Sequence, residues 1–322
     1  MSSAGRLGPG PGLSLGGLTT EEVRQDLAEL DLMGPGELVA LLTGDSRRAL
    51  DAVVRAVPTI TAAVELVYER LSGGGRLIYV GAGTAGRLAV LDAAELGPTF
   101  NVPEGEALGV IAGGDRALRH PAEGAEDDAD AGAAAMDDTR LSGADALLAV
   151  SASGRTPFVL GAARRGRALG CGTVGLTANR GSALAAEVDV AIELVVGGEV
   201  VAGSSRLNAG TAQKIALNTI STAVMVLLGK TYGNLMVDVR ATNAKLRDRA
   251  VRIVDGVTGV GPELAAEALG AAGWDVKLAA LVAASGLGPD DARALLASAG
   301  GRLRTALEQA GRERKRAQNS HE

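Results

Sequence analysis

The stretch Gly81-Ala82-Gly83-Thr84-Ala85-Gly86-Arg87 decides how the fold of this chain is interpreted. It follows the apolar run Leu77–Val80, which predicts a buried strand, and it precedes residues 88–95, whose pattern predicts a helix. Glycine after a strand allows a sharp turn, and the first turn of a helix offers unpaired N–H groups to an anion. The stretch therefore predicts a phosphate or sugar-phosphate site, and it also fits the dinucleotide fingerprint G-x-G-x-x-G.

Strands and helices alternate from residue 76 to about 200, which is typical of an α/β fold. The predicted strands are short and continuously apolar, as expected for strands that are buried on both faces of a parallel sheet. We therefore predict a doubly wound parallel sheet flanked by helices, with its ligand at the carboxyl ends of the strands. The predicted strands are residues 76–80, 108–112, 145–150, 172–176 and 189–194.

Helical spacing of apolar residues marks the segments on either side of the sheet. The predicted helices there are 21–32, 36–43 and 46–71, which Pro58 divides, and later about 209–230 and 242–256. A small all-α domain with a weak internal repeat follows. The predicted organisation is a disordered tail at 1–17, N-terminal helices at 18–75, the α/β domain with its long helices at 76–257, the small helical domain at 258–310 and a frayed tail at 311–322.

The composition argues against several classes of protein. The formal net charge is −6 and the basic residues are scattered, which argues against a nucleic-acid-binding surface. The single cysteine, Cys171, permits no intramolecular disulfide, and two histidines without a Cys/His cluster give no reason to expect a metal site. We find no apolar run of about 18 residues and no signal peptide, so we expect a soluble, cytoplasmic protein that binds neither membrane nor nucleic acid.

Small polar residues at predicted helix starts indicate where an anion binds. The third strand leads into Ser151-Ala152-Ser153-Gly154-Arg155-Thr156-Pro157, where three hydroxyls lie beside a helix start that proline suits. These residues fit a phosphate cradle without a P-loop lysine, and they fit an ordinary serine-rich turn about as well. A second group of hydroxyl and basic residues precedes the helix at 209–230. The predicted substrate-binding residues are Gly83, Thr84, Ser151, Ser153, Thr156, Ser204, Ser205 and Lys214.

Two of the 38 acidic residues stand out by position. Glu95 ends the helix that the glycine-rich stretch begins, just before the breaker Gly97-Pro98, and Glu126 lies in an acidic patch after the second strand. A positioned pair of carboxylates can abstract and donate protons without a metal. On spacing alone, solvated surface carboxylates explain both residues better, and His120 is an alternative base.

Together these motifs resemble those of the N-acetylmuramic acid 6-phosphate etherase family. The resemblance runs from about residue 45 to the C-terminus. The matching motifs are Gly81–Leu88, Leu91–Glu95, Pro98–Phe100, Ile111–Gly114, Glu123–Asp127, Ala152–Pro157, Ala209–Lys214, Tyr232–Val239 and Ala241-Thr242-Asn243. Ala85, Ala94, Leu96 and Gly97 depart from the residues that the family usually has there.

The resemblance implies a sugar isomerase (SIS) domain followed by a helical domain, in a homodimer that needs no cofactor. The implied reaction cleaves the D-lactyl ether of N-acetylmuramic acid 6-phosphate by elimination and then hydration. Its products are N-acetylglucosamine 6-phosphate and D-lactate, and it belongs to the recycling of cell-wall amino sugars. The proton-donating glutamate of the family falls on Glu95, and its second catalytic glutamate falls on Glu126.

Two other functions fit parts of the sequence. Related SIS-domain proteins regulate transcription or kinases, so a non-catalytic sugar-phosphate-binding regulator is the alternative, although the chain offers no basic helix-turn-helix. A nucleotide-dependent dehydrogenase fits G-x-G-x-x-G alone, but it needs an acidic residue about 20 residues past the motif. The nearest candidate, Asp115, lies roughly ten residues too late, which disfavours a dinucleotide.

Overall fold

The computed structural model describes residues 17–239, 241 and 243–319; of the tail predicted at 1–17, residues 1–16 lie outside the described residues. The centre of the fold is a five-stranded parallel sheet in the order β2-β1-β3-β4-β5. Strands β1, β3 and β4 are buried along their whole length, which confirms the prediction from their continuous apolar runs. The strands are β1 (Leu77–Gly81), β2 (Ala107–Ile111), β3 (Ala146–Val150), β4 (Gly172–Thr177) and β5 (Val190–Glu193).

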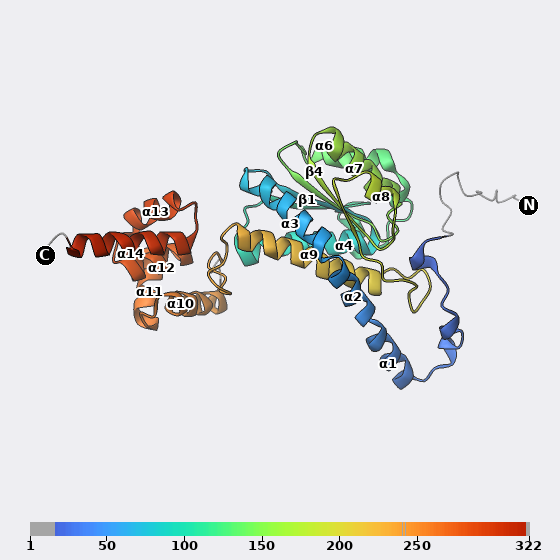
Figure 1. Cartoon of the computed structure of the whole chain (residues 1–322), viewed down its shortest axis with the longest axis horizontal. Helices are drawn as coiled ribbons and strands as arrows, with labels where there is room; N and C mark the ends of the chain where they lie inside the picture. The colour runs from blue at the N-terminus through green and yellow to red at the C-terminus, as the bar shows by residue number, and fades with distance from the viewer. Residues whose placement is uncertain (1–16, 240, 242, 320–322) are drawn as a thin grey trace, which may run out of the picture. The chain divides into compact units, whose positions relative to one another are not determined.

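Helices cover both faces of the sheet, which confirms the doubly wound fold (Figure 1). Helix α3 (Val57–Ser72) packs on one face, where a Cβ added at Gly172 of β4 would lie 2.7 Å from the Leu66 side chain. Helix α4 (Gly83–Phe100) lies on the same face against β1 and β2. Helices α7 (Pro157–Ala168) and α8 (Ala183–Ala186) cover the other face, and α6 (Ala129–Asp138) packs against α7.

The first part of the chain differs from its prediction. The helix predicted at 21–32 is wrong, because these residues form three 3₁₀ turns, η1 (Thr19–Glu21), η2 (Gln25–Leu27) and η3 (Leu30–Leu32). Besides the short backbone hydrogen bonds of these turns, residues distant in sequence hold the segment and its start. The Thr19 N–H donates to Asn179, and the Arg24 guanidinium donates to Asp45.

Two further helices, α1 (Pro35–Asp45) and α2 (Arg47–Arg55), form what we call the N-terminal arm. Helix α1 has no buried residue, although it contains several aliphatic side chains. Helix α2 is fixed to the loop after β5, since Arg48 donates to the carbonyl of Gly198 and Arg55 to the carbonyl of Val195. The break between α2 and α3 confirms the division predicted from Pro58, which occupies the first turn of α3.

Helix α4 is longer than predicted. It runs through Gly97-Pro98 and ends at Phe100, so the predicted end of this helix is wrong. Proline in the last turn removes only one hydrogen bond, and the helix stops two residues later. The next residue, Asn101, has a positive φ of 52°, and its N–H donates to the carbonyl of Gly97.

A buried ion pair lies at the amino ends of β1 and β3. Asp145 accepts hydrogen bonds from the backbone N–H and the guanidinium of Arg76, at 2.9 and 2.8 Å, and from the backbone N–H of Ser142. Burial by itself raises the pKa of Asp145, but the hydrogen bonds from Arg76 and Ser142 outweigh it and hold that pKa below its usual range. Next to this pair, burial raises the pKa of the Cys171 thiol to about 12.

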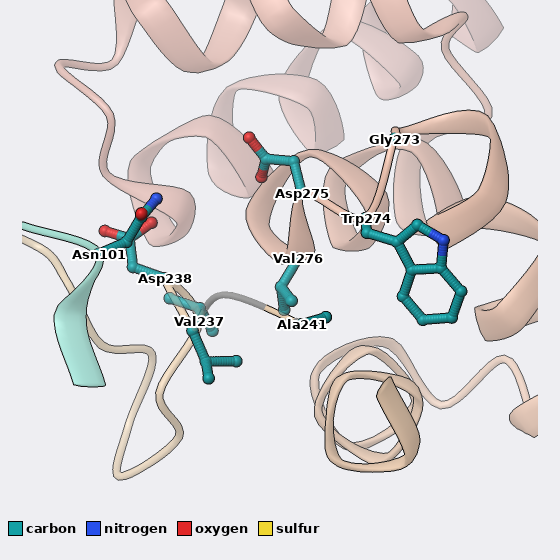
Figure 2. Close-up of a pocket in the computed structure, with 9 residues that line it drawn as sticks. Asn101, Val237, Asp238, Ala241, Gly273, Trp274, Asp275 and Val276 are labelled. Carbon is teal, nitrogen blue, oxygen red and sulfur yellow. The ribbon is translucent and has the colours of Figure 1, made fainter. Parts of the chain in front are cut away.

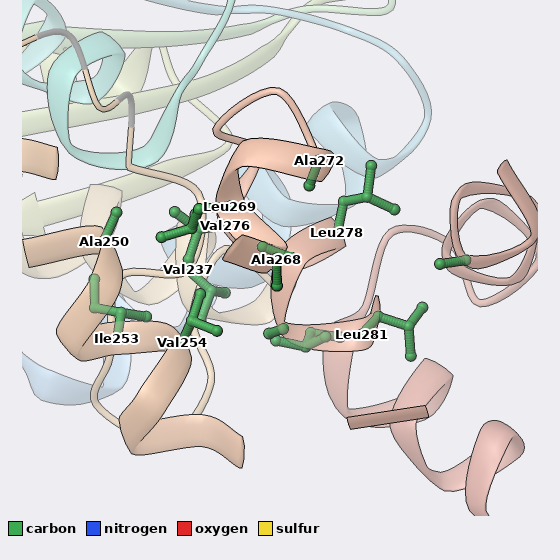
Figure 3. Close-up of a cluster of buried hydrophobic side chains, with 14 of the residues drawn as sticks. Val237, Ala250, Ile253, Val254, Ala268, Leu269, Ala272, Val276, Leu278 and Leu281 are labelled. Atoms are coloured by element: carbon green, nitrogen blue, oxygen red, sulfur yellow. The ribbon is translucent and has the colours of Figure 1, made fainter. Parts of the chain in front are cut away.

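The chain divides into two compact units, Met1–Ala93 with Gly105–Ile220, and Ala94–Glu104 with Ser221–Glu322. The second unit is helical, and its core is built from small and branched aliphatic side chains (Figure 3). Trp274 packs against this core, with the Arg247 guanidinium 4.9 Å from the centre of its ring. Its main helices are α10 (Ala244–Thr258), α11 (Pro262–Ala271), α12 (Val276–Ser285), α13 (Pro289–Ser298) and α14 (Leu303–Asn319), which confirms the predicted all-α character.

Candidate functional site

Four loops begin at one edge of the sheet. Gly81 at the end of β1 is in register with Ile111 of β2 and Val150 of β3, and Val150 is in register with Leu176 of β4. In a doubly wound sheet this carboxyl edge holds the ligand, at the point where the strand order reverses. That point lies between β1 and β3, so the loops that follow these two strands are the first candidates.

Glycine occupies the positions of the first loop for different structural reasons. A Cβ at Gly81 would lie 2.7 Å from the backbone nitrogen of Gly86, and a Cβ at Gly86 would lie 2.6 Å from the Ile111 side chain. Both positions therefore serve the close packing of β1, α4 and β2. Gly83 is different, because it has a positive φ of 54°, is exposed and has open space where a side chain would stand. Gly83 and the half-buried Thr84 are the first two residues of α4, so the start of this helix is accessible to solvent.

The loop after β3 brings three hydroxyls together. Ser151 Oγ and Thr156 Oγ1 are 2.8 Å apart, and Ser151 Oγ and Ser153 Oγ are 3.4 Å apart. Ser151 is buried, while Ser153 and Thr156 are half-buried. The loop can turn this tightly because Gly154 has a positive φ of 65° and a Cβ there would lie 2.4 Å from Ser182 Oγ.

This loop ends at the start of α7, whose first turn offers donors to a ligand. Pro157 has no N–H, and the Thr156 side chain does not cap the helix. Within the described part of the chain, the N–H groups of Phe158 and Val159 meet no acceptor. Two backbone donors and three hydroxyls therefore converge at the carboxyl edge of the sheet, which is the chemistry of a phosphate cradle.

Helix α9 (Asn208–Leu227) corresponds to the helix predicted at 209–230. Unlike those of α7, its first N–H groups already have an acceptor within the chain. The Glu199 carboxylate accepts the N–H groups of Asn208 and Ala209 at 3.0 and 2.9 Å. Glu199 is 1% exposed. The predicted anion site at this helix entrance thus has its leading N–H groups occupied by the chain itself.

The side chains predicted to bind substrate near α9 remain available. Ser204 and Ser205 are half-buried, and Lys214 is exposed one turn into the helix. A Cβ at Gly210 would lie 3.4 Å from Thr84 Cγ2 and 3.3 Å from the carbonyl oxygen of Ser205. The first turns of α4 and α9 are therefore packed together, and that contact brings Thr84 close to Ser205.

The two predicted catalytic glutamates lie in different units. Glu126 belongs to the first unit, on the 3₁₀ turn η4 (Ala125–Asp127) between β2 and α6, and it is exposed. Glu95 belongs to the second unit, is also exposed, and lies on α4 within its continuous helix. The alternative base, His120, is exposed at the end of the short helix α5 (Arg116–Arg119). The catalytic role of either glutamate stays a prediction.

Sequence reasoning missed three buried polar groups next to these loops. Asp92 of α4 accepts hydrogen bonds from the Tyr79 hydroxyl and from the Asn218 side chain of α9. Gln213 of α9 is buried, and its Nε2 has no hydrogen-bond partner within the described residues. Glu199 is the third. Only its glycine neighbours could have drawn attention to it, since its partners lie nine and ten residues further along the chain.

The second unit holds a pocket of about 290 Å³ that no motif predicted (Figure 2). Its lining includes the polar residues Asn101, Asp238 and Asp275 and the apolar residues Val237 and Val276. The Asp238 carboxylate is already paired with Lys277 and Lys230, at 2.7 and 3.2 Å. The Asp275 carboxylate caps α12. The pocket therefore presents little unpaired charge.

Neither metal-binding clusters nor single spanning helices occur in the described residues. No group of three or more histidine, cysteine, aspartate or glutamate side chains there could hold a metal ion. No helix by itself is long and apolar enough to cross a membrane, whereas α11 and α12, bent by 117°, meet the criteria of length and composition together.

Comparison with known proteins gives close relatives over most of the chain. The family model of the glucokinase regulatory protein N-terminal SIS domain matches residues 59–165. A curated protein of Rubrobacter xylanophilus is 58% identical over 91% of this chain and 97% of its own, and one of Deinococcus radiodurans is 53% identical over 89% and 94%. One of Actinobacillus succinogenes is 46% identical over 92% and 97%. All three are named N-acetylmuramic acid 6-phosphate etherase.

Solved structures match more distantly. A phosphoheptose isomerase of Neisseria gonorrhoeae is 19% identical, covers 59% of this chain and 98% of its own, and has a TM-score of 0.45. A sugar-phosphate isomerase of Listeria monocytogenes, described as putative in its own name, is 17% identical, covers 62% and 94%, and has a TM-score of 0.45.

Proposed function

We propose that this chain, which belongs to the N-acetylmuramic acid 6-phosphate etherase family, cleaves the D-lactyl ether of N-acetylmuramic acid 6-phosphate. The products would be N-acetylglucosamine 6-phosphate and D-lactate. The observation that carries the proposal is the identity of 58% to a relative of that name, over 91% of this chain. The hydroxyl loop at the carboxyl edge of the sheet adds a seat for the phosphate of that substrate.

The phosphate would bind at the start of α7. The hydroxyls of Ser151, Ser153 and Thr156 and the N–H groups of Phe158 and Val159 supply donors, and the helix dipole favours negative charge at this end. Gly83 and Thr84 would shape the sugar side of the site, since they open the neighbouring loop. We assign Ser204, Ser205 and Lys214 to side-chain contacts with the substrate.

The reaction needs only proton transfers and water, so no cofactor is required. Opening of the sugar ring makes C1 an aldehyde and acidifies the proton on C2. When a carboxylate removes that proton, the electron pair forms the C2–C3 double bond and the C3–O bond breaks. A carboxylic acid gives its proton to the leaving oxygen, which departs with D-lactate. Water then adds across the double bond, with hydroxyl at C3 and a proton at C2.

Glu95 and Glu126 are the proposed acid and base. The family resemblance assigns proton donation to Glu95, and Glu126 takes the remaining proton transfers. Both carboxylates are exposed in the single chain, so they can exchange protons with solvent between turnovers.

We also propose that the chain works as a cytoplasmic homodimer in the recycling of cell-wall amino sugars. Support comes from the N-terminal arm and the start of α3, where five aliphatic side chains are 40–65% exposed. Exposed aliphatic side chains that gather on one segment often mark an interface. These residues are Val39, Leu42, Leu50, Val54 and Val57.

We also propose that the α/β domain begins at residue 76 and ends at residue 257, where the small helical domain begins.

Release of D-lactate tests the proposed reaction. The purified protein is incubated with N-acetylmuramic acid 6-phosphate, and D-lactate is measured with a D-lactate dehydrogenase. The expected result is one D-lactate for each N-acetylglucosamine 6-phosphate formed. N-acetylmuramic acid without its phosphate serves as the control and should react far more slowly. Binding of the substrate without release of D-lactate would favour a regulator over an enzyme.

A further inference from the structure

The start of α9 is a helix end at which every leading donor is already taken. Two of its first four N–H groups bind the Glu199 carboxylate, and the other two bind backbone carbonyls of the preceding turn. The donors and acceptors are Asn208 and Ala209 with Glu199, Gly210 with Ser205, and Thr211 with Leu207. This end therefore has no N–H group for a ligand, in contrast to the first turn of α7.

Glu199 also brings negative charge to this helix end. Its residue is 1% exposed, and none of the ion pairs among the described residues includes it. Arg206 and Lys214, the nearest basic residues in sequence, are exposed. In space, Arg24 and Arg48 lie against the neighbouring Gly198 and Gly197, but both guanidiniums are paired with Asp45. The Glu199 carboxylate, which has no ion-pair partner of its own, therefore disfavours a second anion at this helix end.

A second carboxylate reinforces this arrangement. The side-chain amide of Asn208 donates to Asp45 at 2.7 Å while its backbone N–H donates to Glu199. Asp45 is itself held by Arg24 and Arg48. The end of α1 is thereby joined to the start of α9, and Asn208 is fixed in the position that presents its N–H to Glu199.

The blocked start of α9 lies close to the proposed phosphate site. The first turn of α9 packs against the first turn of α4, as the closeness of Gly210 to Thr84 shows. Helix α4 begins directly after β1, and α7 begins in the loop after the neighbouring strand β3. The starts of α4, α7 and α9 therefore lie near one edge of the sheet. Without a block at the start of α9, a phosphate could bind there instead of at the start of α7.

We propose that Glu199 is a specificity-determining residue that closes the start of α9 to phosphate and so confines the phosphate to the start of α7. It is a positioning residue, since it acts through the helix and does not contact the reacting atoms. This role rests on the proposed function in one respect: the ligand must carry a phosphate. It predicts that removing the Glu199 side chain frees the N–H groups of Asn208 and Ala209 and creates a second phosphate site.

Thermal unfolding with inorganic phosphate as the probe tests this, with chloride added to keep the ionic strength equal. In the natural chain phosphate should raise Tm, and the double variant Ser151→Ala, Thr156→Val should lose most of that rise. Adding Glu199→Ala to the double variant removes the acceptor and its volume, and it should restore at least half of the rise. The matched control is Glu193→Ala, since Glu193 also accepts a backbone N–H, from Gly181, which lies in a loop. It should restore nothing.

A triple variant that stays as insensitive to phosphate as the double variant would overturn the proposal, as would a double variant that keeps the full rise. If the Glu199→Ala chain does not fold, crystals of the natural chain grown with tungstate decide. The expected density lies at the first turn of α7 and is absent from the N–H groups of Asn208 and Ala209; tungstate on these groups would contradict the proposal. Neither experiment depends on turnover, so a failure to release D-lactate would leave both interpretable.

Discussion

The Tyr79 hydroxyl donates a 2.8 Å hydrogen bond to Asp92, which joins strand β1 to helix α4 inside the first unit. Both residues are buried, and Asp92 also accepts a hydrogen bond from Asn218 of α9. Asp92 precedes Glu95 by three residues on the same helix. The turn of α4 that leads to the proposed proton donor is therefore fixed to the sheet and to α9 by polar contacts as well as by packing.

Replacing Tyr79 by phenylalanine removes one donor from the buried Asp92. We expect the free energy of unfolding to fall by about 1–3 kcal/mol, because the carboxylate keeps its desolvation cost and loses a partner. We also expect kcat for D-lactate release to fall, since α4 carries Glu95. Urea unfolding and the lactate assay measure the two effects. Thr61→Ala, which removes an exposed hydroxyl, is the control and should change stability by less than about 0.5 kcal/mol.

The hydroxyl loop after β3 is predicted to affect binding more than chemistry. Ser151→Ala and Thr156→Val should each raise KM by about tenfold or more and leave kcat nearly unchanged, because the phosphate is bound equally in the ground and transition states. Ser72→Ala removes an exposed hydroxyl at the end of α3 and should change neither constant. An unchanged KM in both loop variants would mean that the phosphate binds elsewhere.

Glu95→Gln and Glu126→Gln should each lower kcat/KM by about 10²–10⁴, which is the usual size of a lost acid or base. Glu123→Gln is the matched control, since it removes an exposed carboxylate of the same acidic patch. Circular dichroism checks that the variants are folded. If either catalytic variant kept its full rate, that glutamate would have no role in proton transfer.

The Arg76–Asp145 pair should make the stability of the first unit depend on pH. The pKa of Asp145 in the fold lies below the value of about 3.9 in an unfolded chain. Its stabilising effect is therefore complete above that unfolded value and is lost as the pH falls through the folded one. Asp145→Asn should cost about 2–4 kcal/mol at pH 7, with a smaller difference below about pH 4, as measured by urea unfolding. Asp138→Asn, at an exposed position, should cost little at any pH.

The exposed face of the N-terminal arm should hold the dimer together. Leu50→Glu places a charge in that face, and we expect sedimentation to give the mass of one chain where the natural protein gives two. Leu264→Glu is the control, because Leu264 is comparably exposed, at 56% against 53% for Leu50, but lies on α11. A dimer that survives Leu50→Glu unchanged would exclude this face as the interface.

The sheet was predictable because its strands are continuous apolar runs, and the structure places all five within one or two residues of the predicted bounds. The helix predicted at 21–32 failed because Arg24 in that segment is held by Asp45, a partner that local periodicity cannot reveal. Pro98 suggested an end that α4 passes, since one missing hydrogen bond in a last turn is a small loss.

The candidate site was only partly predictable, for the same reason. The hydroxyls at 151–156 were visible because they follow a strand and precede a proline that starts a helix. Glu199 gave no comparable pattern. Its role depends on a loop that returns its carboxylate to the start of α9, and nothing in residue spacing indicates that return.

Trp274 is the sole tryptophan and lies beside Arg247 in the second unit, while Cys171 is the sole cysteine and is buried in the first. Each unit thus contains one intrinsic reporter of its own unfolding. Indole emission follows the helical unit, and the reaction of the thiol with a maleimide follows the sheet, because the raised pKa of the buried Cys171 keeps it unreactive until the strands separate. Coincident midpoints in urea would mean that the two units melt cooperatively. Any gap between the midpoints would measure how weakly they are coupled, with no residue substituted.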